Sequence, residues 1–316
     1  MTFSLDAHWV WDFWLADDGE QYHLYYLHAP MSLGDQQLRH RNAQIGHAVS
    51  TDLREWTDLG LVLSPGAVGD FDETATWTGC VVRGDDGLWR MFYTGSRFLS
   101  ADSSANIETV GIAVSSDLHV WTKRADAAVA ADPRWYETLG TSAWPEQAWR
   151  DPWVFADPHG EGWHMLVTAR SNSGDELDRG VIGHATSSDL DSWVVQPPLS
   201  ATGAGFKHLE VPQVVTIDGH PVLLFSCDTP ALVGARTKGG VWAVELDAVT
   251  GPYPTDRAEL LVDERLYSGR AIQNRAGEWV LLAFENATDD GGFTGSLSDP
   301  ISLSWSDGRL HLEEVS

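Results

Sequence analysis

The sequence predicts an all-β fold, a five-bladed β-propeller, from a pattern that recurs five times along the chain. In each unit an alternating apolar run leads to a turn rich in Asp and Gly, then to an aromatic and β-branched run and a third strand. Such units, each roughly 60 to 70 residues long, bury their apolar faces only by stacking against neighbours. A propeller achieves this and protects the sheet edges by arranging the blades around a channel.

The aromatic and β-branched run is the clearest part of the repeat. It reads as a strand by length and β-propensity in all five units. The five runs are Tyr22 to Leu27, Trp89 to Thr94, Trp163 to Thr168, Pro221 to Ser226 and Trp279 to Phe284. Each follows a turn that ends in glycine, at Gly19, Gly87, Gly162, Gly219 and Gly277. These turns predict hairpins.

Three of the third strands end in a shared tag. The tags are GHAVSTDLREW (46–56), GIAVSSDLHVW (111–121) and GHATSSDLDSW (183–193). The Ser-Asp-Leu part predicts a turn, and the final Trp is expected to pack between blades, because large aromatics at repeat positions usually serve packing.

The segment from Ile301 to Glu313 predicts a last hairpin that completes or closes the ring. Because no linker or low-complexity segment divides the chain, we expect residues 1–316 to form a single five-bladed propeller domain. A pair of β-sandwich domains is the alternative.

Charge and composition restrict the partners. With 46 acidic and 20 basic residues, the net charge of −26 would repel nucleic acid and anionic membranes, so a small neutral substrate is expected. No apolar run reaches membrane-spanning length, and Met1 to Val10 lacks the basic start of a signal peptide. Cys80 and Cys227 are too few for a disulfide framework or a zinc site. We therefore expect a cytoplasmic protein; the sequence leaves its oligomeric state open.

The start of each first strand is where functional residues are expected, because these strands line the channel and converge at its mouth. The five positions are Asp12 in WVWDFW, Trp77-Thr78-Gly79, Asp151 in WRDPWVF, Glu210 in HLEVPQVV and Tyr267-Ser268-Gly269. A carboxylate there is costly unless it is hydrogen-bonded or functional. A single one could simply accept backbone hydrogen bonds. Three at equivalent positions favour a site, since converging carboxylates separate their pKa values as glycoside hydrolysis requires.

These motifs resemble those of glycoside hydrolase clan J. Asp12 in WVWDFW resembles the nucleophile motif of the levansucrases of family 68, and Arg150-Asp151-Pro152 resembles a motif they share with the invertases of family 32. Glu210 in LEVPQ is similar to the acid motif of both families. DETATWTG (72–79) and Leu266-Tyr267-Ser268 resemble two further invertase segments.

The resemblance implies a retaining double displacement on a fructofuranoside such as sucrose, a fructo-oligosaccharide or a difructose anhydride. Asp12 would attack the anomeric carbon, Glu210 would act as acid and then base, and Asp151 would hold fructose hydroxyls. Arg150 would contact the sugar or orient Asp151, with a salt bridge within the blades as its alternative role. The residues expected to bind substrate are Trp11, Trp14, Trp77, Thr78, Arg150, Gln213 and Tyr267, with core packing an equal alternative for Trp14. Neither a cofactor nor a metal is expected.

The chain also departs from these families. It lacks the Asn-Asp-Pro-Asn-Gly signature of invertases and is shorter than typical levansucrases, so the choice between families 32 and 68 stays open, as does fructosyl transfer. An inverting arabinofuranosidase or xylosidase of the family 43 type is an alternative, although Phe13 follows Asp12 where that family usually has Pro. A non-catalytic sugar-binding propeller is the alternative of another class. Segments 97–109 and 134–148 are long enough to form the leaving-group subsite.

Overall fold

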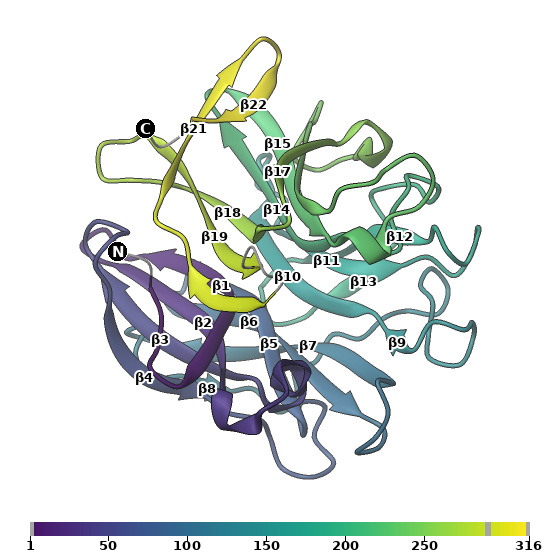
Figure 1. The fold of residues 1–316 in the computed structure, drawn as a ribbon, viewed down its shortest axis with the longest axis horizontal. Coiled ribbons are helices and arrows are strands. Elements are labelled where there is room, and N and C mark those ends of the chain that lie inside the picture. The colour runs from purple at the N-terminus through teal and green to yellow at the C-terminus, as the bar shows by residue number, and fades with distance from the viewer. Residues whose placement is uncertain (1–2, 288–291, 314–316) are drawn as a thin grey trace.

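A computed structural model of the chain describes residues 3–287 and 292–313. Five sheets are arranged in a ring, and the colours of Figure 1 pass around it once from purple to yellow. In every sheet the first strand in sequence is at one end of the strand order, and these first strands contact one another around the centre. This is a five-bladed β-propeller, so the predicted fold class is confirmed.

The first three blades are antiparallel sheets, with one added parallel strand in blade 2. Blade 1 holds β1 (His8–Asp17), β2 (Tyr22–Pro30), β3 (Gln44–Ser50) and β4 (Thr57–Leu63). Blade 2 holds β5 (Ala75–Arg83), β6 (Trp89–Phe98), β7 (Asn106–Ser115), β8 (Thr122–Lys123) and the parallel β9 (Glu146–Gln147). Blade 3 holds β10 (Trp149–Ala156), β11 (Trp163–Arg170), β12 (Gly180–Ser187) and β13 (Val194–Gln196).

The last two blades follow the same plan, and short 3₁₀ turns connect strands in blades 1 and 4. Blade 4 holds β14 (Glu210–Ile217), β15 (His220–Cys227), β16 (Gly240–Glu245) and β17 (Glu259–Asp263). Blade 5 holds β18 (Leu266–Gln273), β19 (Trp279–Ala287), β20 (Phe293–Leu297), β21 (Ile301–Ser306) and β22 (Arg309–Leu312). The 3₁₀ turns are η1 (Met31–Leu33), η2 (Gln36–Asn42), η3 (Thr229–Ala231) and η4 (Thr255–Arg257).

The five predicted second strands are all present as β2, β6, β11, β15 and β19, each a few residues longer than the run that predicted it. The turn glycines before them all have positive φ angles, between 81° and 109°. Glycine adopts this region without steric cost, which explains its place at the end of each turn.

Blade 5 closes the ring against blade 1, where yellow strands of blade 5 lie beside the purple β1 in Figure 1. The Leu297 amide donates to the carbonyl of Phe3 at 2.9 Å. The predicted hairpin over 301–313 exists as β21 and β22, which form the outer edge of blade 5.

Two of the tag tryptophans pack between blades as predicted. Trp121 of blade 2 lies edge-on to Tyr25 of blade 1, and Trp193 of blade 3 lies edge-on to Phe92 of blade 2. Trp56 is half-buried against the core shared by blades 1, 2 and 5. These apolar contacts between blades hold the ring together.

Among the residues that the structure describes, no helix is both long and apolar enough to cross a membrane.

Candidate active site

Every first strand carries a β-bulge at the same place. The pairing register with the second strand shifts between Trp11 and Phe13, Trp77 and Gly79, Arg150 and Trp153, Glu210 and Gln213, and Tyr267 and Arg270. Bulges bend a strand and re-aim a side chain, and they are frequent next to active sites. In this protein they turn one residue of each blade toward a common point.

The register corrects one step of the sequence prediction. The first residues out of register are Asp12, Thr78, Asp151, Val211 and Ser268. Glu210 is still paired, opposite Ser226. It is the last paired residue before the bulge, as Arg150 and Tyr267 are in the two neighbouring blades. Two carboxylates, not three, therefore share the bulged position, and Glu210 enters the site from one residue earlier.

Three bulged residues adopt the left-handed region: Asp151 (φ 57°), Val211 (φ 52°) and Ser268 (φ 51°). Such a conformation costs about 1–3 kcal/mol for a residue other than glycine. Each amide is held by the preceding blade. Asp151 N donates to Thr94 Oγ1 (2.9 Å), Val211 N to Asp151 Oδ2 (3.2 Å) and Ser268 N to Ser226 Oγ (2.9 Å). The ring of blades thus fixes the strained backbone.

Each oxygen of the Asp12 carboxylate accepts a hydrogen bond from a neighbouring blade. Thr78 Oγ1 of blade 2 donates to Oδ2 and Ser268 Oγ of blade 5 donates to Oδ1, both at 2.5 Å. Burial raises the pKa of the Asp12 carboxyl, and these two hydrogen bonds oppose the rise. The result is a carboxylate with a fixed orientation and little solvation.

Asp151 is buried more deeply. Its Oδ2 accepts from Thr168 Oγ1 at 2.8 Å as well as from the Val211 amide. Burial raises the pKa of Asp151 to about 6; Arg150 opposes the rise, whereas Asp12 and Glu210 add to it.

The pKa of Glu210 shifts in the opposite direction to those of Asp12 and Asp151. Arg150 Nη2 donates to its Oε1 at 2.9 Å, and Tyr267 Oη donates to its Oε2 at 2.5 Å. Burial alone would raise the pKa of Glu210, but His208, Arg150 and Tyr267 together lower it to about 2. Glu210 is therefore ionised in the resting site.

Arg150 connects the site to blade 2. Its Nη1 donates to both oxygens of the fully buried Glu108, at 3.1 and 3.0 Å, while Nη2 reaches Glu210. The salt bridge within the blades, foreseen as the alternative role, is thus present together with the bond to Glu210. The planar guanidinium suits this double role because its donors point in fixed directions.

The carboxylates open into a cavity of about 700 Å³. Of the residues predicted to bind substrate, five line it: Trp11, Trp77, Thr78, Arg150 and Tyr267. Trp77 is oriented by a hydrogen bond from its Nε1 to the His40 carbonyl at 2.7 Å. The segment 97–109 contributes six lining residues, but only Glu146 of segment 134–148 reaches the cavity.

Two predicted contacts are corrected by the structure. Trp14 is fully buried and stacks on Tyr25 in the core, because its strand position points away from the cavity. Gln213 is buried beyond the bulge, where its side chain accepts from the Ala271 amide (2.7 Å) and donates to the Ala271 carbonyl (2.9 Å). Gln213 therefore joins blade 4 to blade 5 instead of lining the cavity.

Several cavity residues were missed by the sequence prediction. Arg39 and His40 come from η2, and His208 and Asp228 flank Glu210. No periodic signal marks η2, since it is an insertion between β2 and β3. Ser268 could have been found, because it matches Thr78 in the repeat.

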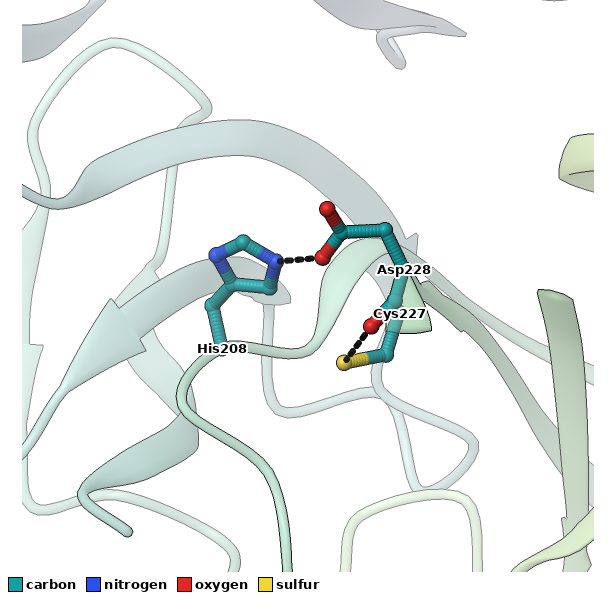
Figure 2. Close-up of side chains that lie close together, drawn as sticks. All are labelled: His208, Cys227 and Asp228. Atoms are coloured by element: carbon teal, nitrogen blue, oxygen red, sulfur yellow. Dashed lines mark hydrogen bonds and ion pairs between the residues drawn. The ribbon is translucent and has the colours of Figure 1, made fainter. Parts of the chain in front are cut away.

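One group of side chains offers donor atoms for a metal. The ligand atoms of His208, Cys227 and Asp228 lie within 4.8 Å of one another (Figure 2). However, Cys227 Sγ points at the Asp228 carbonyl at 3.7 Å, and burial raises the pKa of the thiol. Metals bind the thiolate, so this group is better described as a polar cluster beside Glu210.

Comparison with known proteins gives a consistent picture. The model of the family described as "Glycosyl hydrolases family 32 N-terminal domain" matches residues 14–313, beginning just after Asp12. A sucrose-6-phosphate hydrolase of Pediococcus pentosaceus is 30% identical over 181 residues, covering 57% of this chain and 32% of that protein. One from Zymomonas mobilis is 24% identical over 93% of this chain and 57% of its own length. The chain thus spans between a third and three fifths of these relatives.

Among solved structures, the inulosucrase of Halalkalicoccus jeotgali bound to kestose is similar in fold. It has a TM-score of 0.80 at 24% sequence identity, and the match covers 98% of this chain and 87% of that one.

Proposed function

The chain belongs to glycosyl hydrolase family 32, and from that premise we propose that it is a retaining β-fructofuranosidase. Membership agrees with the predicted place in clan J and sets aside the family 43 alternative. The proposed substrates are neutral fructosides such as sucrose, fructo-oligosaccharides or difructose anhydrides, with fructosyl transfer as a second outcome of the same intermediate.

The observation that carries the proposal is the pair of hydrogen bonds that fix both oxygens of Asp12. A nucleophile must be ionised and held in one orientation to attack an anomeric carbon. The Thr78 and Ser268 hydroxyls provide the orientation and favour the ionised form. Glu210 lines the same cavity with a partly exposed carboxylate, and it is the group proposed to exchange a proton with the leaving oxygen.

The proposed reaction has two steps. Asp12 attacks the anomeric carbon of fructose while Glu210 gives a proton to the leaving oxygen, and Asp151 bonds fructose hydroxyls as positive charge develops on the ring. Glu210 then takes a proton from water, or from an acceptor sugar, which displaces Asp12. Trp11 and Trp77 supply apolar walls for the sugar faces.

The test is sugar release from sucrose, inulobiose, levanbiose and a difructose anhydride by the wild type, Asp12→Asn and Glu210→Gln. We expect release by the wild type alone, with both variants reduced by about 10⁴-fold or more. In methanol, a retaining enzyme gives the methyl β-fructofuranoside, which proton NMR identifies. Binding of these sugars without turnover by the wild type would instead support a sugar-binding propeller.

A second substrate candidate is a phosphorylated fructoside. The relatives are named sucrose-6-phosphate hydrolases, and Arg39 lines the cavity with its Nε lacking a hydrogen-bond partner among the described residues. Sugar release from sucrose and from sucrose-6-phosphate, measured for the wild type and for Arg39→Gln, decides between the neutral and the phosphorylated substrate. The cytoplasmic location stays a prediction and is tested by cell fractionation.

A further inference from the structure

The resting state of Glu210 poses a chemical problem for the proposed reaction. The acid must hold a proton when the leaving oxygen departs, yet Arg150 and Tyr267 both donate to its carboxylate. These bonds favour the ionised form, and together with the charge of a protonated His208 they lower the pKa of Glu210 to about 2. A second group close to Glu210 must therefore hold the proton between turnovers.

His208 is placed to do this. It precedes β14 by two residues, its side chain is 12% exposed, and its Nε2 lies 3.4 Å from Glu210 Oε2. The same Nε2 lies 3.4 Å from Asp228 Oδ1, and Figure 2 shows that contact. Neither His208 Nε2 nor Asp228 Oδ1 makes a hydrogen bond of good geometry within the part of the chain that the structure describes. The imidazole thus stands between two carboxylates without being committed to either.

The other ring nitrogen faces a cation. Arg150 Nη2 lies 3.5 Å from His208 Nδ1, so a proton on Nδ1 faces a donor of the guanidinium and no hydrogen bond forms there in the imidazolium. Glu210 and Asp228 favour the imidazolium and raise the pKa of His208, whereas burial and the Arg150 charge oppose it. A proton on His208 is therefore held, but remains transferable.

We propose that His208 is a positioning residue that shares one proton with Glu210 and returns it to the carboxylate as the leaving group departs. This inference depends on the proposed acid–base role of Glu210. The Asp228 carboxylate lies close enough to stabilise the imidazolium, and Trp144 packs edge-on against the ring.

The proton balance closes over one turnover. In the first step Nε2–H breaks, Glu210 receives that proton and passes it to the leaving oxygen, and His208 becomes neutral. In the second step the water oxygen bonds the anomeric carbon as the bond from that carbon to Asp12 breaks and releases the carboxylate; the water proton goes to Glu210 and then to Nε2. The pair therefore holds about one proton at rest and titrates as a unit.

The charged and titratable groups that face His208 come from four elements. They are Arg150 of β10, Glu210 of β14, Cys227 and Asp228 at the end of β15, and Tyr267 of β18, which reaches it through Glu210. Of these, the Glu210 carboxylate is the one whose charge changes in the reaction.

The first test separates acid catalysis from binding. His208→Gln should lower kcat/KM on sucrose by about 100-fold at neutral pH, the usual contribution of a general acid. The same variant should keep kcat/KM on 4-nitrophenyl β-fructofuranoside within about threefold of the wild-type value, because that leaving group departs without a proton. The alkaline limb of the sucrose profile should move to lower pH. His184→Gln, a buried imidazole of the outer part of blade 3, is the matched control and should change neither rate.

The second test needs no activity. NMR titration gives the pKa of His208 in the wild type and in Glu210→Gln. The pKa should be lower in the variant by about one unit or more, since the neutral amide removes the charge that holds the proton. It should not fall on His184→Gln. An unchanged His208 pKa, or equal losses on both substrates with an unmoved alkaline limb, would overturn the inference. If the wild type cleaves no fructoside, the proposed function fails, and the NMR titration still decides whether the proton is shared.

Discussion

The inner bulges and the outer turns of this propeller repeat in different ways. The three Ser-x-Asp-Leu turns, which begin at Ser50, Ser115 and Ser187, share one geometry. In each, the Ser hydroxyl accepts from the amides two and three residues further on, and the Asp carboxylate accepts from the amides two and three residues after the Asp. The Leu has φ between 64° and 66°. The five bulges share one backbone distortion but carry Asp, Thr, Asp, Val and Ser.

Within one repeat, the outer turns therefore serve stability and the inner bulges serve the site. The outer turns satisfy their own backbone groups, so the same residues serve equally well in each blade. Four of the five bulged residues line one cavity and the fifth, Ser268, bonds Asp12 there, so the blades supply different groups according to their place around the site. A hydroxyl from blade 2 and one from blade 5 orient the carboxylate of blade 1, so the site exists only when the ring is closed.

Exchanging a bulge carboxylate should give the largest effect on activity and almost none on folding. Asp12→Asn and Asp151→Asn keep the side-chain shape but remove the charge, and kcat should fall by about 10⁴-fold and 10³-fold, respectively. Because burial raises the pKa of both carboxyls, ionisation opposes folding at neutral pH. The midpoint of thermal unfolding at pH 7 should therefore be unchanged or higher. A large fall in that midpoint would mean that these carboxylates hold the ring together.

Removing a bulge hydroxyl should give the next largest effect. Thr78→Val and Ser268→Ala each take one hydrogen bond from Asp12, and we expect kcat/KM to fall by about 10- to 100-fold. These bonds lower the pKa of Asp12, so its pKa should rise further in either variant. Activity requires ionised Asp12 and is lost as pH falls through that pKa, so the acid limb should move to higher pH.

Thr76→Val is the control for the hydroxyl variants. Thr76 is buried on the same strand as Thr78, but its Oγ1 faces the Ala43 carbonyl at 3.4 Å and does not touch Asp12. Its pH profile should match that of the wild type. A matching shift in Thr76→Val would show that loosening of β5, not the bond to Asp12, is responsible.

Parts of the molecule governed by local rules were predictable. The turn glycines and aromatic runs place the second strands, and the order of the motifs brings Asp12, Asp151 and Glu210 to one cavity. The offset of Glu210 was not predictable, because a bulge leaves no periodic trace and only pairing with Ser226 reveals it. His208 and Asp228 were missed because they stand outside the repeat, one before a first strand and one after a second.

A variant of Gln213 distinguishes a role in joining the blades from a role in binding sugar. Its amide satisfies both backbone groups of Ala271, so Gln213→Leu leaves a buried donor and acceptor unpaired. We expect a loss of about 2–3 kcal/mol in the free energy of unfolding, measured with urea. The KM for sucrose should stay within about twofold, since the side chain does not reach the cavity. A raised KM at unchanged stability would restore Gln213 as a sugar contact.

The outer turns should give the smallest effects, and equal ones. Ser50→Ala, Ser115→Ala and Ser187→Ala each remove an acceptor for two backbone amides, at a cost of about 1 kcal/mol in the free energy of unfolding. Because the three turns lie in different blades, the costs should add in the triple variant. Denaturant unfolding measures this, and kcat should not change. Unequal costs would mean that the turns differ in their contacts with neighbouring blades, and a fall in kcat would mean that the outer rim and the cavity are coupled through the blades.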